Sequence, residues 1–260
     1  MDVDPDGGPL PALNQLILAQ TALGIGVPVL LRTGAPGPEE VDPFGEESYR
    51  VQVGLAARLM EAGSLDRLVV DDPAARDVAP RLLERPLLAL NFHGIEPEHF
   101  DVVREQLTRA ASLGPTFDLD ATHAVGEVRV LFAFYDGFAD TAAFAADVCH
   151  DLGLRAVFFP LTSAEHGARL VTDVELADLA TAHEVGWHTA NHMGAEEVDA
   201  DDVETEVVEP FRRIEQVTGR APRIGAWCFG SRFDPDRPGN PALVDLGLTH
   251  LVSNWSVERV

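Results

Sequence analysis

Three short segments of the sequence carry side chains whose type and spacing suit the binding of a metal ion. Asp136 follows a mostly apolar run and precedes a glycine, so its carboxylate is expected at the end of a buried strand. His188 and His192 are four residues apart and can present both imidazoles to one ion, on a helix or on a turn. Two histidines and one carboxylate commonly hold a catalytic metal, because they leave positions open for water and substrate. The pattern predicts a metal site; the alternative is a set of ordinary core and turn residues.

The third segment is an apolar run that ends in a glycine turn and contains Trp227, Cys228 and Phe229. Aromatic rings near a site can stack on sugar rings, although aromatic residues on a strand more often pack in the core. Cys228 is interpreted as a turn thiol beside the pocket. These three residues are therefore the candidates for substrate binding.

Each of these segments follows a run of strand length, and such runs alternate with helical patterns along the chain. Strict alternation favours parallel strands with helices outside. We expect an α/β fold, a distorted (β/α) barrel of about seven or eight parallel strands with outer helices and with chemistry at the strands' C-terminal ends. A doubly wound open sheet is the second choice. The expected strands are residues 29–32, 67–70, 87–92, 128–134, 156–159, 185–188, 224–229 and 250–253, and the expected helices are residues 47–62, 74–83, 97–113, 140–152, 173–183, 201–218 and 241–246.

The charge balance is strongly acidic, with 43 Asp and Glu against 19 basic residues, all of them Arg, and a net charge of −24. Nucleic acid as a partner is not expected, since phosphate binding needs a basic surface. Anionic membrane surfaces are disfavoured for the same reason. The even spread of acidic residues indicates a halophile-like surface or, alternatively, an ordinary acidic protein from a GC-rich genome. The acidic run at residues 196–206 is expected to be a solvated face around a helix N-terminus.

Targeting signals and disulfides are not expected. The N-terminus is acidic and lacks the basic and apolar regions of a signal peptide, and no apolar run reaches the roughly 20 residues of a membrane span. We therefore expect a cytoplasmic protein that does not insert into a membrane. The two cysteines, Cys149 and Cys228, do not suggest a disulfide framework.

Together these segments resemble the polysaccharide deacetylases, the family four carbohydrate esterases. The family's first motif, Thr-Phe-Asp-Asp-Gly, corresponds to Ala-Phe-Tyr-Asp-Gly at residues 133–137, and its second, His-Ser/Thr-x-x-His, corresponds to residues 188–192. Its third motif, Tyr-Pro-Tyr-Gly in the branch acting on exopolysaccharide amino sugars, resembles Trp-Cys-Phe-Gly at residues 227–230. That branch also opens with a strand that ends in Tyr-His, similar to residues 91–93. The resemblance covers about residues 86 to 255.

The resemblance implies a ligand set and assigns roles to its neighbours. Asp136, His188 and His192 would hold one divalent metal ion, with zinc as the expected ion. His93 would be the general acid. Tyr135 stands where the family has its general base, an aspartate. A phenol with a pKa near 10 is a poor base at neutral pH. Tyr135 is therefore either a catalytic or substrate-contacting residue or an aromatic residue that fills a catalytically inactive pocket.

Three functions follow from the resemblance. The first is a metal-dependent hydrolase that removes acetyl groups from a glycan or related N-acyl compound, thus acting on non-peptide amide bonds. The second is a non-catalytic descendant that binds a metal or a glycan, and the third is an amidohydrolase acting on a small cyclic amide. Residues 87–260 are interpreted as the catalytic domain, which the family pattern would extend beyond Val260. Residues 1–86 are interpreted as an α/β segment of unknown role. This segment would complete the barrel, cover the pocket or contact a partner.

Overall fold

The computed structural model describes residues 29–31, 68–70, 87–112, 114–121, 129–163, 168–253 and 256–260. The helices expected over residues 47–62 and 74–83 lie outside this range, as does nearly all of the segment 1–86. Two strands of that segment are described, β1 (Val29–Leu31) and β2 (Leu68–Val70), which pair in parallel with Val29 opposite Leu68.

The chain divides into two compact units, residues 1–91 with 97–132 and residues 92–96 with 133–260. In the first unit, strand β3 (Leu87–Phe92, of which Phe92 falls in the second unit) is followed by a 3-10 turn η1 (Pro97–His99) and helix α4 (Phe100–Ala111). After the helix, Phe117 N donates to the Val130 carbonyl and Val130 N to the Pro115 carbonyl. These two bonds place residues 115–117 beside the start of the next strand.

The second unit contains a series of parallel strands. β4 (Arg129–Asp136, of which residues 133–136 fall in this unit), β5 (Val157–Pro160) and β6 (Glu184–Val185) pair in parallel, with Ala133 opposite Val157 and Val157 opposite Glu184. β7 (Ile224–Ala226) and β8 (His250–Ser253) are also parallel, and β9 (Ser256–Arg259) closes this sheet in the antiparallel direction.

One residue connects the two sheets. Trp187 N donates to the Ile224 carbonyl, and Ala226 N donates to the Trp187 carbonyl, so the ladder continues from the end of β6 to β7. The expected α/β class with parallel strands is confirmed. The closure of these strands into a barrel stays a prediction.

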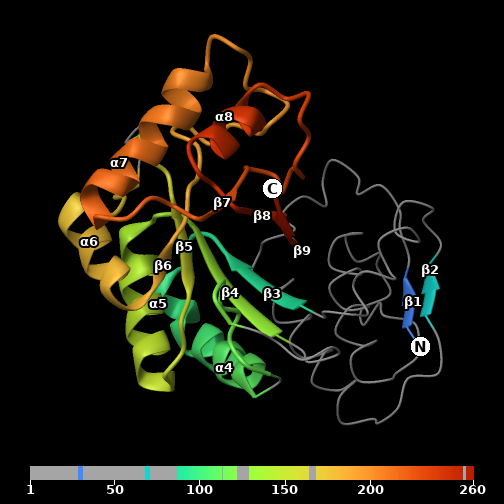
Figure 1. Cartoon of the computed structure of the whole chain (residues 1–260). Helices are drawn as coiled ribbons and strands as arrows, with labels where there is room; N and C mark the ends of the chain where they lie inside the picture. Colours follow the sequence, from blue (N-terminus) through green and yellow to red (C-terminus); the bar gives the residue numbers. More distant parts are fainter. Residues whose placement is uncertain are drawn as a thin grey trace. The chain divides into compact units, whose positions relative to one another are not determined.

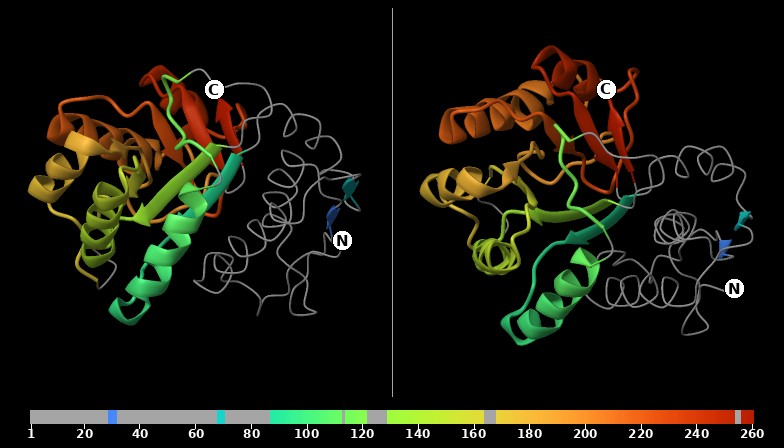
Figure 2. Two further views of the ribbon diagram at one scale, coloured as in Figure 1. Left: turned by 90° about the horizontal axis from the view of Figure 1, so that it is seen from below. Right: turned by 60° about the horizontal axis from the view of Figure 1, so that its bottom comes forward.

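The helices of the second unit lie on one side of its strands. Figure 1 shows α5 (Ala139–Leu152), α6 (Asp173–Ala182) and α7 (Glu209–Thr218) beside β4, β5 and β6, and the two views of Figure 2 show the same arrangement from other directions. The short helix α8 (Gly239–Asp245) follows β7. The helix expected over residues 201–218 begins with a π-helical turn, η2 (Glu204–Val208). Among the described helices, none has both the length and the apolar character that crossing a bilayer requires.

Local sequence explains where these helices begin and end. The Thr172 side chain accepts from Glu175 N while the Glu175 carboxylate accepts from Thr172 N, which is a capping box at the start of α6. α5 and α7 end at Gly153 and Gly219, each with a left-handed backbone that glycine adopts without strain. These local signals therefore set the start of α6 and the ends of α5 and α7.

The hydrophobic core of the β6–β7 region contains both buried tryptophans. The rings of Trp187 and Trp227 meet edge to face, with centroids 4.8 Å apart. Trp187 Nε1 donates to the Val207 carbonyl and Trp227 Nε1 to Asn240 Oδ1, so neither indole N–H is left unsatisfied. The core therefore supports both of the loops that follow β6 and β7.

Candidate metal centre

Strand β4 brings Asp136 to its C-terminal end. The strand is buried along nearly its whole length, and Asp136 itself is 5% exposed. Asp136 and Gly137 both have left-handed backbones, with φ of 65° and 73°. A Cβ added at Gly137 would also lie only 3.1 Å from the Cβ of Pro160. The glycine thus allows the tight turn that ends the strand at the carboxylate.

His188 follows Trp187, directly after the bridge between the sheets, and is 1% exposed. Its Nδ1 lies 2.5 Å from the carbonyl oxygen of Ala226. Because a carbonyl only accepts, Nδ1 carries a proton, and Nε2 is the ring nitrogen that faces the candidate site. A backbone partner of this kind orients an imidazole for metal binding.

The two imidazoles and the carboxylate converge on one point. Asp136 Oδ1 lies 3.6 Å from His188 Nε2 and 3.6 Å from His192 Nε2. This Oδ1 is buried and has no hydrogen-bond partner. Tetrahedral zinc ligands, with bonds of about 2.0–2.2 Å to nitrogen and oxygen, lie about 3.4 Å apart, close to these separations. A buried carboxylate oxygen without a partner is costly, and a cation between these three atoms would satisfy it.

Cys228 contributes a further group to the same place. Its Sγ lies 3.4 Å from His188 Nε2 and 3.4 Å from Thr189 Oγ1, and the residue is 2% exposed. The possible ligand atoms of His188, His192 and Cys228 all lie within 4.8 Å of one another. The structure therefore brings the thiol, proposed from the sequence as a substrate contact, next to the imidazoles.

The other two residues proposed for substrate binding lie in different surroundings. Trp227 is 1% exposed in the core. Phe229 is 66% exposed, has a left-handed backbone, and places its ring edge to face with His192 at 5.3 Å. Of this pair, only Phe229 presents a surface on which a ligand beside His192 could stack.

His93 and Tyr135 flank the carboxylate on its other side. His93 Nδ1 lies 2.7 Å from Asp136 Oδ2, so the two carboxylate oxygens face different partners. Tyr135 stacks between His93 and Phe159, with ring centroids 5.1 and 5.0 Å away, and is 5% exposed. The phenol is thus packed among aromatic rings at the edge of the site.

The electrostatics of the site follow from burial and from these contacts. Burial alone would raise the pKa of the Asp136 carboxyl, but His188 and His93 outweigh it and hold that pKa well below its usual range. Burial alone would lower the pKa of His188, but Cys228 and Asp136 raise it to about 10. Burial, with the negative charges of Asp136 and Cys228, holds the pKa of Tyr135 well above its usual range. Asp136 is therefore ionised, Tyr135 is neutral, and a metal would displace the proton that His188 binds so strongly.

Sequence reasoning missed Glu206, which lies behind the histidine loop. Its carboxylate accepts from Asn191 N at 3.0 Å and from Asn191 Nδ2 at 2.5 Å, and Glu206 is 4% exposed. The expectation of a solvated acidic face is wrong at this residue, because the π-helical turn directs it inward. The only signal was its position next to the apolar Val207 and Val208.

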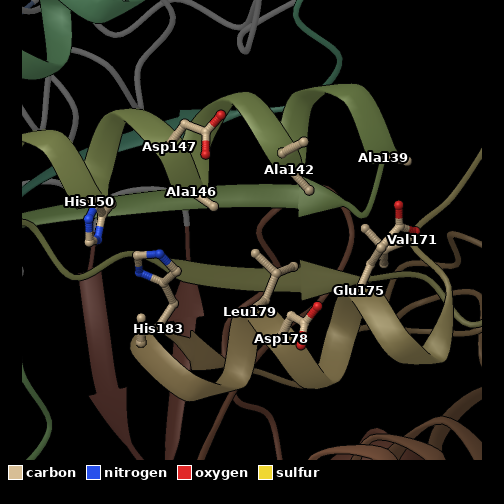
Figure 3. Close-up of a pocket in the computed structure, with 12 residues that line it drawn as sticks. Ala139, Ala142, Ala146, Asp147, His150, Val171, Glu175, Asp178, Leu179 and His183 are labelled. Carbon is tan, nitrogen blue, oxygen red and sulfur yellow. The ribbon is translucent and has the colours of Figure 1, made fainter.

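A separate hollow lies between α5 and α6 (Figure 3). Its volume is about 320 Å³, and it is lined by small residues of α5 such as Ala142 and Ala146 and by Asp178, Leu179 and His183 at α6. None of the predicted site residues lines it. This hollow is therefore distinct from the candidate metal centre.

Comparison with known proteins agrees with the fold. Residues 123–249 match the family model of the polysaccharide deacetylases. The resemblance found in the sequence is therefore confirmed over this range. No curated protein matches the sequence.

Two solved structures are similar in fold. IcaB from Ammonifex degensii is 16% identical with a TM-score of 0.54, over 64% of this chain and 82% of that chain. The deacetylase PplD from Streptococcus pyogenes, in complex with acetate, is 16% identical with a TM-score of 0.51, over 63% of this chain and 80% of that chain. At these identities the likeness concerns the fold.

Proposed function

We propose that this chain is a metal-dependent hydrolase that removes acetyl groups from a glycan or a related N-acyl compound. The observation that carries the proposal is the buried, unpartnered Oδ1 of Asp136, which faces the Nε2 atoms of His188 and His192 at 3.6 Å each. Once His188 gives up its Nε2 proton, the carboxylate oxygen and the two imidazole nitrogens are three electron-pair donors that suit a cation. The match of residues 123–249 to the family model of the polysaccharide deacetylases supports the same reaction class.

Asp136, His188 and His192 would hold the ion, and zinc suits this mixed set of imidazole and carboxylate. When bound, such an ion supplies a Lewis acid that polarises an acyl carbonyl and acidifies water. His93 is held by Asp136 Oδ2 through Nδ1, so Nε2 is the atom that would pass a proton to a leaving amine or alcohol. The exposed ring of Phe229 would stack on the sugar.

A second function, a non-catalytic metal- or glycan-binding domain, is favoured by Tyr135. The residue occupies the position of the family's base, and its burial with a raised pKa keeps the phenol protonated at neutral pH. If no other group accepts the proton of the attacking water, the domain would still bind its metal or glycan but would not hydrolyse a substrate.

Metal content tests the site itself. We expect about one equivalent of zinc in the wild type by elemental analysis and a loss of it in His188→Ala. His150→Ala is the matched control, because His150 is an exposed histidine on α5 beside the separate hollow, and it should keep the ion. Absence of metal from the wild type after supplementation with zinc would refute the proposed hydrolase.

Turnover then separates the two functions. Tyr135→Asp restores the family's residue, and we expect it to raise hydrolysis of an N-acetylglucosamine oligomer above the wild-type rate by about 100-fold, the usual contribution of a general base. Metal content is measured on the same sample. A loaded variant that remains inactive on this oligomer would instead support the non-catalytic binding domain.

A further inference from the structure

We propose that the Cys228 thiolate is a fourth protein ligand of the ion, so that the resting site holds its metal with two imidazoles, one carboxylate and one thiolate. The inference rests on the metal site of the proposed function, but not on its hydrolytic activity. It changes the role of Cys228 from substrate contact to ligand.

The distances from His188 Nε2 to two other groups fit ligands that share one ion with it. Asp136 Oδ1 lies 3.6 Å from this nitrogen and Cys228 Sγ lies 3.4 Å from it. For zinc with bonds of about 2.3 Å to sulfur and about 2.0 Å to nitrogen, a tetrahedral arrangement separates S from N by about 3.5 Å. The sulfur is thus at the separation expected for two ligands of one ion.

The backbone holds the sulfur in this place. A parallel bridge pairs Gly194 with Cys228, so the segment after the second histidine runs beside the cysteine. The turn that follows is fixed by left-handed backbones at Phe229 and Gly230, with φ of 62° and 73°. Cys228 is therefore positioned by the same loops that position the histidines.

A neighbouring hydroxyl is arranged to stabilise a thiolate. Thr189 Oγ1 accepts the backbone N–H of Met193 at 3.0 Å, which leaves its own proton to be donated to Cys228 Sγ at 3.4 Å. Hydrogen bonds to a ligating sulfur are typical of the surroundings of metal-bound cysteines. The unpartnered Oδ1 of Asp136, 5% exposed, is the independent sign that a cation belongs here.

Two consequences follow from a thiolate ligand. A soft sulfur donor favours zinc over magnesium, calcium or manganese, which prefer oxygen ligands. Four protein ligands also close a tetrahedral site, whereas catalytic zinc keeps one position open. In this site a carbonyl or water must displace Cys228 or add as a fifth ligand, so the thiolate controls access to the ion.

Cobalt substitution tests the proposal, because Co²⁺ bound to a thiolate shows an intense near-ultraviolet charge-transfer band that oxygen and nitrogen ligands do not produce. We expect this band in the wild type loaded with one equivalent of Co²⁺, and its loss in Cys228→Ser. The matched control is Cys149→Ala, which removes the other thiol, buried in α5, and should keep the band. We also expect Cys228→Ser to bind zinc at least about tenfold more weakly than the control.

The outcomes are distinguishable from failure of the proposed function. Cobalt bound to the wild type without the band, or a band that persists in Cys228→Ser, overturns the thiolate ligand and leaves the three-residue site standing. No cobalt bound to the wild type overturns both. If Cys228→Ser does not fold, alkylation of wild-type Cys228 by iodoacetamide decides the question: protection by one equivalent of zinc is expected, and equal labelling with and without zinc overturns the proposal.

Discussion

Glu206 is the residue that fixes the loop between the two histidines. Its two carboxylate oxygens accept from the backbone and the side chain of Asn191, and Asn191 directly precedes His192. His192 has a left-handed backbone, with φ of 63°, which a non-glycine residue keeps only when its surroundings hold it. Glu206 would therefore act on the proposed metal site through the loop.

We expect Glu206→Gln to weaken zinc binding by about 10–100-fold, the usual effect of losing a partner behind a ligand. The amide replaces one acceptor by a donor, which then faces an N–H of Asn191. Glu204→Gln is the control, because Glu204 lies on the same π-helical turn with a largely exposed side chain. Competition with a zinc chelator measures both, and equal affinities would show that Glu206 has no positioning role.

His183 makes stability depend on pH. Burial, and then the charges of Arg155 and His150, lower its pKa below the ordinary value of 6.5, and its Nδ1 accepts from Ala156 N. The unfolded chain therefore binds a proton near pH 6.5 that the folded chain does not. Stability is retained above that pH and falls as pH decreases through it toward the folded pKa.

We expect His183→Gln to reduce the loss of unfolding free energy between pH 7 and pH 5. Urea denaturation at several pH values measures the slope. His250→Gln, at the partly exposed start of β8, should keep the wild-type slope. An unchanged slope in His183→Gln would place the pH dependence elsewhere in the chain.

At the scale of elements, the close approach of β6 and β7 depends on Gly186. A Cβ at this position would lie 2.5 Å from a ring carbon of Phe159 and 2.8 Å from the Ile224 carbonyl oxygen. The two strands must be this close for Trp187 to bridge them and for His188 to reach the Ala226 carbonyl. The packing of elements therefore sets the orientation of the His188 imidazole, a proposed metal ligand.

Gly186→Ala should destabilise the fold by about 1–3 kcal/mol, because the strand and the ring must separate. It should also weaken zinc binding, since His188 moves with the strand. Gly153→Ala is the control, because a Cβ there meets nothing within 4 Å and only the left-handed backbone is strained. Denaturation and zinc titration of both variants test this prediction. If Gly186→Ala binds zinc as tightly as the control, the close contact between the strands does not affect the metal site.

At the scale of the whole molecule, the net charge of −24 predicts a strong response to salt. Screening of self-repulsion raises the unfolding temperature, and the Debye length is already about 10 Å at 0.1 M. The two interpretations of the acidic composition differ above that concentration. An ordinary acidic protein should level off near 0.2 M NaCl, whereas a halophile-like surface should continue to gain stability above 1 M. Thermal unfolding across this range distinguishes them, and a temperature that falls on adding the first 0.2 M would contradict both.

Much of the fold followed from the sequence, because buried strands and amphipathic helices have local signatures. The apolar runs before Asp136 and His188 predict strand ends from local sequence alone. The motifs of the resembling family occur in the same order along this sequence. These signals predicted the α/β class and the deacetylase resemblance, both confirmed. The roles of the site residues stay predictions, although the structure brings Asp136, His188, His192 and His93 together.

The tertiary structure decided what depends on contacts between distant segments. Cys228 meets His188 across 40 residues and Glu206 meets Asn191 across 15, and no local pattern encodes either contact. The same holds for Trp227, whose ring fills the core while the ring of Phe229, two residues along, faces solvent. By itself the sequence determined which residue types end the strands, since that is a property of each segment. The packing of the segments decides which of these residues surround one ion, lie in one core or join one hydrogen-bond network.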